Sequence, residues 1–540
     1  MMRRVPRTCV LALVIAGGAC ATAGVRQPPR AAARPKLIVQ LVMDQMRADY
    51  VPRYGAQWTK GLHRLLTEGA HFTEARYPYA GTVTCAGHAS VGTGTVPSIH
   101  GMALNEWWDR EQRLRIPCPN DPLVTPIGFT KHVEARYSGR RMMAETFAAR
   151  LDASQPAAAG RVVSLSLKPR SAIGLAGRTG DAVVWFDSRG SFATSSAYLN
   201  PSWLDAWLKA HPIEPMVSAA WTRARPAASY IGTDDEPGAR PPVGWTRTFP
   251  HTLSDAGRAD AEFYDRWQRS PYSDAYLADM AMAAIDALGL GRGEGIDYLG
   301  VSFSALDLVG HKFGPASHEV QDVLIRADEA IGRLLAHLDG AVGAGNYVVA
   351  LTADHGVGDV PEERGGGRLP RGAVTAIVED VLDKAWGAAT HVEAEIYTDV
   401  YLSEPSRARL ASDPAARGAV RKAIAALPAV LQVMTADDMK GARASSNPMI
   451  AGVLLSYVPD RSGDLVILLR EHFTSSTDAV SHGTYYDYDR RVPVILFGSP
   501  FKAGTYESPA SPLDIAATWS RLTGVALDRP HGRSLDAAVK

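Results

Sequence analysis

Acidic, basic and imidazole side chains follow four apolar runs of the sequence, at the point where each run ends. These side chains are Asp44 (run 36–44), Lys168 (161–168), Asp307 (296–307) and the pair Asp354 and His355 (346–355). The runs are short and rich in Val, Ile and Leu, which is typical of buried parallel strands. Open α/β sheets bind ligands beyond the carboxyl ends of such strands. We therefore expect these side chains to share one site.

Two further histidines complete a set that could bind metal. His311 lies four residues after Asp307, which places both on one face of a helical turn, and His482 lies in a glycine-containing loop before the run 491–498. Carboxylate and imidazole ligands in this mixture suit Zn²⁺, with other divalent ions as alternatives. The set is large enough for two metals: Asp44, Asp307, Asp354, His311, His355 and His482. We expect His88, His100 and His318 to support the site or the fold.

The stretch 77–101 is rich in small and hydroxyl residues, and it offers a nucleophile. Thr84 follows Gly81 where "TCAGHASVGTG" could open a helix. A threonine hydroxyl needs a metal or a base to react at neutral pH. A helix N-terminus beside a metal would favour its alkoxide and attract a phosphate group. Cys85 is the competing nucleophile, but a thiol would require a histidine base rather than a ring of carboxylates, so we prefer Thr84.

The elements that must position these side chains alternate between strands and helices. The runs 182–187 and 491–498 also look like buried parallel strands, and 274–288 and 320–339 have helical patterns. This alternation predicts an α/β fold with a central, mostly parallel sheet flanked by helices. Two segments, 188–275 and 361–460, are expected as insertions with loops, the second forming a small subdomain.

The charge balance argues against a polyanion-binding surface. The chain has 540 residues, and its 57 Lys and Arg equal its 57 Asp and Glu in number, so the formal net charge is zero. The length is sufficient for a large buried core. We expect no nucleic-acid partner.

The N-terminus has the pattern of a secretory signal peptide. A basic start is followed by an apolar run too short to span a bilayer, which ends in small residues, so we expect a signal peptide at 1–23 and a disordered leader at 24–35. A lipid anchor at Cys20 is the less favoured alternative, because Gly17 stands where a lipobox usually has Leu. No other transmembrane span is expected. The mature protein is predicted to be exported, either periplasmic or secreted.

Two cysteines remain in the expected mature chain, Cys85 and Cys118. An exported protein could join them in a disulfide. The alternative is that Cys85 is a small buried residue and Cys118 a loop thiol.

Taken together, the motifs resemble those of the alkaline phosphatase superfamily over residues 36–540. The sequences that carry the resemblance are "TCAGHASVGTGTVPSIHG", "SFSALDLVGHKFGP", "TADHG" and "SHGTYYDYDRRVPVILFG". They are most similar to the periplasmic, phosphate-irrepressible alkaline phosphatases that use a threonine nucleophile. Nucleotide pyrophosphatase/phosphodiesterases are related. The resemblance implies an alkaline-phosphatase-like catalytic domain over 36–540.

The resemblance also implies a role for each site residue. One zinc would be held by Asp307, His311 and His482, and the other by Asp44, Asp354, His355 and the oxygen of Thr84. Asn105, in "ALNEWWD", matches an asparagine that contacts the phosphoryl group. Lys168 and Arg170, in "SLSLKPRSAIG", match a pair that monoesterases carry and diesterases generally lack.

The expected activity is hydrolysis of phosphate monoesters, with two Zn²⁺ per chain, through a phosphothreonine intermediate. Three alternatives remain open. A phosphodiesterase or nucleotide pyrophosphatase would use the same metals, and Lys168 and Arg170 argue against it. The second alternative is a sulfatase or phosphonate hydrolase. Sulfatases typically have the motif C/S-x-P-x-R at the nucleophile, and this motif is absent around Thr84. An exported phosphate-binding protein would show no turnover.

Overall fold

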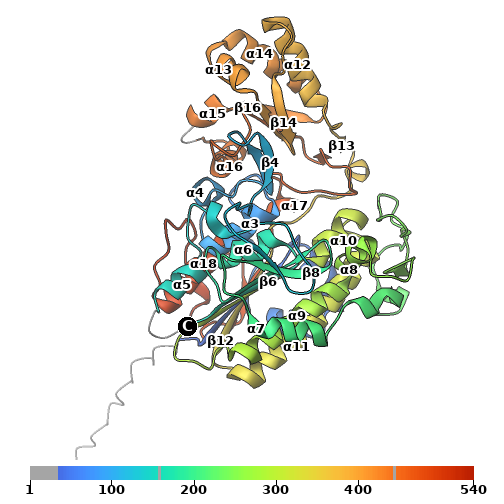
Figure 1. Ribbon diagram of the computed structural model, residues 1–540, viewed down its shortest axis with the longest axis vertical. Coiled ribbons are helices and arrows are strands. Elements are labelled where there is room, and N and C mark those ends of the chain that lie inside the picture. Colours follow the sequence, from blue (N-terminus) through green and yellow to red (C-terminus); the bar gives the residue numbers. More distant parts are fainter. Residues whose placement is uncertain (1–33, 156–159, 442–444) are drawn as a thin grey trace, which may run out of the picture. The chain divides into compact units, whose positions relative to one another are not determined.

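The computed structural model describes residues 34–155, 160–441 and 445–540 (Figure 1). The described residues form one compact unit, Arg34–Lys540, which includes the predicted catalytic domain 36–540. The predicted signal peptide and all but the last two residues of the predicted leader lie outside the described residues. Within the described part of the chain, no helix is both long and apolar enough to cross a membrane.

A ten-stranded sheet forms the centre of the molecule. Its order is β20-β2-β19-β12-β1-β11-β6-β7-β8-β5, and the five strands from β12 to β7 are parallel. The strands are β1 (Leu37–Met43), β2 (Ala70–Phe72), β5 (Pro126–Gly128), β6 (Val162–Ser166), β7 (Ala182–Asp187), β8 (Ser191–Ser195), β11 (Asp297–Phe303), β12 (Tyr347–Thr352), β19 (Val494–Gly498) and β20 (Gly504–Tyr506). The predicted α/β fold with a mostly parallel sheet is therefore confirmed.

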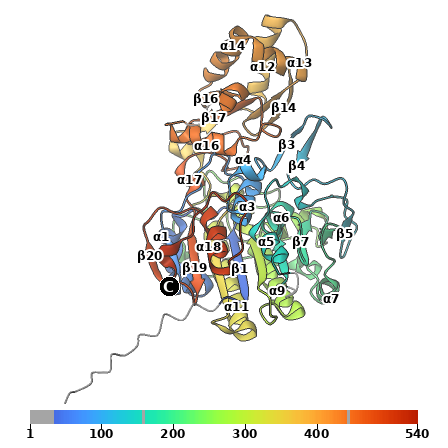
Figure 2. The same ribbon diagram turned by 90° about the vertical axis from the view of Figure 1, so that its left-hand side faces the viewer.

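Helices cover both faces of this sheet, which explains why the strands are apolar throughout. In β1, Val39 and Leu41 belong to one buried cluster and Ile38 to another, because successive side chains of a strand point to opposite faces. The first cluster includes residues of α2 (Gly61–Glu68), α9 (Pro271–Leu288) and α11 (His318–Leu338). The second includes residues of α5 (Phe147–Ala153), α6 (Pro169–Ala176) and α18 (Leu513–Thr523), as can be followed in Figure 2.

Strand β19 corrects one prediction. The run 491–498 was expected to be parallel, but β19 lies antiparallel to both β12 and β2. The direction of β19 follows from the position of the loop that precedes it. The His482 loop lies at the carboxyl edge of the parallel strands, so the strand that follows it must run away from that edge.

The second insertion forms a sheet of its own, with the order β14-β15-β17-β16 (Figure 1). The strands are β14 (Val392–Ile396), β15 (Asp399–Leu402), β16 (Val430–Thr435) and β17 (Leu465–Leu469). Helices α12 (Ala373–Trp386), α13 (Glu404–Ser412) and α14 (Pro414–Ala425) share a separate hydrophobic core with them. We call this unit the small subdomain; β17 extends it beyond the expected range of 361–460.

Candidate active site and metal-binding clusters

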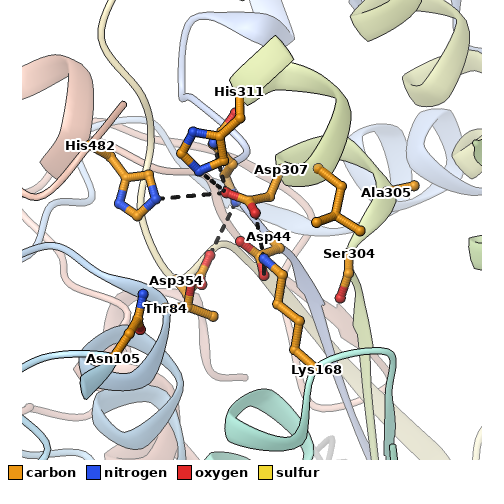
Figure 3. A network of polar contacts seen from close by, with 12 residues as sticks. Asp44, Thr84, Asn105, Lys168, Ser304, Ala305, Asp307, His311, Asp354 and His482 are labelled. Atoms are coloured by element: carbon orange, nitrogen blue, oxygen red, sulfur yellow. Dashed lines mark hydrogen bonds and ion pairs between the residues drawn. The ribbon is translucent and has the colours of Figure 1, made fainter. Parts of the chain in front are cut away.

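The carboxyl ends of four adjacent strands bring the predicted polar residues together (Figure 3). Asp44 directly follows β1, and Asp354 and His355 follow β12. Asp307 lies in the first turn of α10 (Ala305–Phe313), which begins two residues after β11. Lys168 follows β6 and precedes Pro169, the first residue of α6. The parallel arrangement therefore gathers side chains that are up to 311 positions apart in the sequence.

At this site, two groups of side chains are arranged so that each could hold a metal ion. The first group is Asp44, Asp354 and His355, all fully buried, and the second is Asp307, His355 and His482. His355 belongs to both, because its ring stacks on that of His482 with 3.5 Å between centroids. His311 Nε2 lies 3.2 Å from Asp307 Oδ1, on the side of the second group. The structure thus brings together all six predicted ligand side chains.

Backbone carbonyl groups orient all three histidines in the same way. Nδ1 donates a hydrogen bond to the carbonyl oxygen of Val480 from His311 (3.0 Å), of Gly356 from His355 (2.9 Å) and of Thr82 from His482 (2.8 Å). Because a carbonyl oxygen only accepts, each Nδ1 must carry the proton. The Nε2 atom of each ring then faces the carboxylates and is the nitrogen that a metal would bind. This is the tautomer that a metal-binding imidazole requires.

Buried carboxylates create a need for positive charge in this site. Burial raises the pKa of Asp44 well above its usual value, and the nearby Asp354 carboxylate adds to this. Burial would also raise the pKa of Asp307, but the charges of Lys168 and His311 outweigh it and hold that pKa well below its usual value. Asp44 Oδ1 accepts no hydrogen bond from any described residue, and the ring of His88 lies beside Asp354 Oδ2, with its Nδ1 at 3.1 Å. Such a set of carboxylate and imidazole donors fits zinc.

Lys168 connects the two groups. Its Nζ lies 2.6 Å from Asp44 Oδ2 and also donates to Asp307 Oδ2, and the side chain is buried. Arg170 lies two residues further on and lines the adjacent cavity, where its buried Nε has no hydrogen-bond partner among the described residues. Both bases of the predicted pair are therefore at the site, but they have different surroundings.

Thr84 is the first residue of α3 (Thr84–Thr93), as the sequence predicted. Its Oγ1 lies 3.4 Å from His355 Nε2, next to both groups of ligands. The carbonyl oxygen of the Asn105 side chain accepts a hydrogen bond from the backbone N–H of Cys85. This contact uses the amide oxygen of Asn105 at the start of α3 and leaves its NH₂ group available to a ligand. Figure 3 shows Asn105 beside Thr84.

The two cysteines form a disulfide, Cys85–Cys118. This resolves the choice between a disulfide and two free thiols. It also removes Cys85 as the competing nucleophile, because its sulfur carries no thiolate. The bond ties the first turn of α3 to the segment after β4 (Leu114–Pro117).

A cavity of about 720 Å³ opens from the site. Asn105, Arg170, His311 and His482 line its inner end, and the small subdomain lines its opposite wall. Its size is in the range of small-molecule sites, and it is much larger than a phosphate group alone requires.

Comparison with known proteins identifies the family. A family model described as type I phosphodiesterase / nucleotide pyrophosphatase matches residues 38–488. The chain belongs to this family. It is 31% identical to the alkaline phosphatase PafA of Elizabethkingia meningoseptica, with 96% of each chain covered, and 30% identical to the alkaline phosphatase PhoV of Synechococcus elongatus, with 93% of this chain and 92% of PhoV covered.

The solved structures agree with this assignment. The crystal structure of PafA matches with a TM-score of 0.86 at 30% identity, covering 95% of this chain and all of PafA. A PafA variant with substitutions at a threonine, an asparagine, a lysine and an arginine also matches with a TM-score of 0.86, at 29% identity. The predicted membership of the alkaline phosphatase superfamily is confirmed.

Two residues of this type I phosphodiesterase family member were missed in the sequence. Gln45 donates from its side chain to Asp307 Oδ1 (2.7 Å) and from its backbone N–H to Asp354 Oδ1 (3.1 Å), so it links the two ligand groups. Its φ is +70°, an unusual value for a residue other than glycine. The sequence feature that could have pointed to Gln45 is its position directly after Asp44. The second missed residue is Asp274, and no sequence pattern near it indicates a role at the site.

Asp274 supports the helix that carries Asp307 and His311. It lies in the first turn of α9, is buried, and accepts hydrogen bonds from the backbone N–H groups of Ser304 (2.9 Å) and Ala305 (3.2 Å). These N–H groups are at the start of α10, where no helical partner exists. Burial raises the pKa of Asp274 to about 7.

Asp274→Ala is expected to destabilise this family member by about 1–3 kcal/mol, the effect of leaving buried donors unsatisfied. Urea unfolding would measure this. Asp274→Asn is the matched control, because its amide oxygen still accepts, and it should lose less. Equal stability of Asp274→Ala and the unmodified protein would show that the contact does not hold α10.

Proposed function

We propose that this protein is an alkaline phosphatase: a zinc-dependent phosphomonoesterase that acts through a phosphothreonine intermediate and releases inorganic phosphate. A phosphatase is supported by relatives named as alkaline phosphatases, which match over nearly the whole chain. The observation that carries the finer proposal is the placement of Thr84. Its hydroxyl is at the N-terminus of α3 and lies 3.4 Å from Nε2 of His355, the histidine that belongs to both groups of metal-ligand side chains, and Asn105 lies beside it.

The ligand side chains suggest how two zinc ions would be held. Asp307, His311 and His482 would hold one, and Asp44, Asp354 and His355, with the hydroxyl oxygen of Thr84, would hold the other. When bound, the two ions supply positive charge that stabilises the attacking and leaving oxygens of the displacement. His355 belongs to both groups of side chains, so the two proposed ligand sets are adjacent.

The side chains then have separate tasks. Thr84 Oγ attacks phosphorus, and the bond between phosphorus and the leaving-group oxygen breaks. The partial positive charge at the start of α3 favours the deprotonated form of the Thr84 hydroxyl and attracts the phosphoryl group. Burial lowers the pKa of His355, so its Nε2 carries no proton that would repel a metal. Water hydrolyses the phosphothreonine, which regenerates Thr84 and releases phosphate.

Asn105, Lys168 and Arg170 are proposed to bind the non-bridging oxygens. The PafA variant supports this, because its four substituted residues are of the same types as Thr84, Asn105, Lys168 and Arg170. The threonine and the asparagine are 21 positions apart in both chains, and the lysine and the arginine are two positions apart in both.

Removing Lys168 and Arg170 together is expected to lower kcat/KM for a monoester by several powers of ten and for a diester by much less. A monoester carries about two negative charges near neutral pH and a diester one, so only the monoester makes full use of both cations. Each charge-assisted hydrogen bond contributes roughly 1.5–3 kcal/mol, and about 1.4 kcal/mol corresponds to one power of ten. The assay compares para-nitrophenyl phosphate with its bis-ester for Lys168→Ala/Arg170→Ala.

Arg170→Ala alone is the matched control, because Lys168 also contacts the ligands Asp44 and Asp307 and its removal can alter metal binding. Zinc content should therefore be measured for each variant. If monoester and diester rates fall by the same factor at unchanged zinc content, the pair does not recognise the second charge. The assignment as a monoesterase would then lose its main support.

The second candidate is a phosphodiesterase or nucleotide pyrophosphatase, which the description of the matching family model favours. It would use the same ligands and the same threonine. A higher kcat/KM for the bis-ester than for the monoester in the unmodified protein would establish this candidate instead.

Export to the periplasm or the medium is part of the proposal. The Cys85–Cys118 disulfide supports it, because disulfides persist mainly in oxidising compartments. Cell fractionation with N-terminal sequencing of the mature protein tests it. An intact N-terminus in the cytosolic fraction would contradict it.

A further inference from the structure

The hairpin formed by β14 and β15 of the small subdomain ends in a two-residue turn. Ile396 pairs with Asp399, which leaves only Tyr397 and Thr398 between the strands. Turns of this length favour glycine, asparagine or aspartate, because one or both central residues take a positive φ. Tyr397 has a φ of +56°. A bulky aromatic residue in this region is strained, and such strain is concentrated at functional sites.

Buried contacts hold the hairpin against the segment that carries the site. Ile396 and Tyr401 share a hydrophobic cluster with Trp107 and with the disulfide-bonded Cys85 and Cys118. The hydroxyl group of Tyr401 donates to the carbonyl oxygen of Arg461, and Asp399 accepts from the backbone N–H of Gly463. The turn is therefore fixed relative to the start of α3, where Thr84 lies.

Tyr397 faces the same cavity as the predicted phosphoryl-binding residues. It lines that cavity with Asn105 and Arg170, and yet 41% of its surface is exposed. Burial raises the pKa of its phenol, while the nearby positive charge of Arg170 acts to lower it. An exposed aromatic ring thus lines the same cavity as two of the residues predicted to bind the phosphoryl group.

The rest of the cavity wall has a similar character. Tyr457, Met449 and Phe473 of the small-subdomain region and Tyr485 of the His482 loop line it as well. Aromatic and thioether groups favour a flat apolar ligand, and the volume of about 720 Å³ leaves space for one beyond the phosphate.

We propose that Tyr397 and the aromatic wall of the small subdomain form a subsite for the leaving group, which selects phosphate esters of planar aromatic groups by stacking. This inference rests on the proposed phosphatase function. Tyr397 would contact the ester on the side of the bond that breaks, so it would contribute to specificity and not to the chemistry at phosphorus.

The test compares phenyl phosphate with methyl phosphate for Tyr397→Ala and Tyr397→Phe. Each rate is divided by that of the unmodified protein with the same substrate, which cancels the intrinsic difference between the two esters. Tyr397→Ala is expected to lower kcat/KM about tenfold for phenyl phosphate, the effect of a lost aromatic contact with its buried area, and less than about twofold for methyl phosphate. Tyr397→Phe keeps the ring and should resemble the unmodified protein with both.

Leu431→Ala is the matched control. Leu431 is also 41% exposed and belongs to β16 of the same subdomain, but it does not line the cavity. Leu431→Ala should leave kcat/KM unchanged, relative to the unmodified protein, for both phenyl phosphate and methyl phosphate. Inhibition by inorganic phosphate should stay unchanged in Tyr397→Ala, because phosphate has no leaving group.

Tyr397→Gly separates a functional role from a structural one. Glycine adopts positive φ without strain, so this variant should keep its Tm while it loses the preference for phenyl phosphate. If kcat/KM fell by the same factor for phenyl phosphate and methyl phosphate, in Tyr397→Ala or in Tyr397→Phe, the subsite proposal would be wrong. Such a result would indicate that Tyr397 acts through Asn105. Absence of turnover of any ester by the unmodified, zinc-loaded protein would instead refute the proposed function on which the subsite rests.

Discussion

The Thr84→Ala variant is expected to lose turnover on the order of 10⁶-fold, as other hydrolases do when a hydroxyl nucleophile is removed. The reason is that Thr84 is the hydroxyl-bearing side chain that begins α3 and reaches His355 Nε2, at 3.4 Å. With Cys85 in the disulfide, the neighbouring residue supplies no substitute nucleophile. The measurement is kcat/KM for para-nitrophenyl phosphate at full zinc loading.

Two companion variants sharpen this test. Thr84→Ser keeps a hydroxyl group and should retain measurable activity, and mass spectrometry after rapid acid quenching should detect a phosphorylated residue at position 84 in the unmodified protein. Thr93→Ala removes a buried hydroxyl from the other end of the same helix, where Thr93 bonds only to the backbone of Ala89 and Thr95, and it should remain active. Wild-type rates in Thr84→Ala would exclude this residue as the nucleophile.

Removal of metal is expected to abolish activity, and Zn²⁺ is expected to restore it. Two groups of carboxylates and imidazoles at one site support metal binding, as do three histidines whose Nδ1 bonds to a backbone carbonyl and a buried oxygen of Asp44 that has no hydrogen-bond partner among the described residues. Elemental analysis should find about two zinc ions per chain, as in other two-metal hydrolytic sites. Active protein without any transition metal would rule out this proposal.

The structure also predicts how zinc is lost from variants. In the proposed ligand sets His482 holds one zinc ion and His355 the other, so His482→Ala and His355→Ala should each retain about one zinc ion. Zinc should raise the Tm of the unmodified protein, because a ligand that binds only the folded state stabilises it. Mutation of His211, which belongs to none of the groups that could hold a metal and whose Nδ1 bonds to the carbonyl oxygen of Trp207, should leave the zinc content unchanged. Retention of two zinc ions by His355→Ala or by His482→Ala would contradict these ligand sets.

The sequence by itself identified the residues that are proposed to carry the chemistry. Strand ends can be located because a strand buried on both faces must be apolar until it reaches the edge, and Asp44, Asp307 and Asp354 follow such runs. The four-residue spacing of Asp307 and His311, and the position of Thr84 at a helix start, follow from local helix geometry. The family motifs added Asn105 and Arg170, for which no local pattern exists.

Only the tertiary structure decided how these residues are combined. The direction of β19, the stacking of His355 on His482 and the pairing of Cys85 with Cys118 all depend on contacts between distant segments. The hydrogen bonds of Gln45 to Asp307, and of Asp274 to the start of α10, also join elements that are distant in the sequence. Periodicity reports whether a side chain is buried, but not which distant partner buries it. For the same reason, the approach of Tyr397 to the site from an insertion follows from packing between the subdomain and α3, which no local sequence pattern encodes.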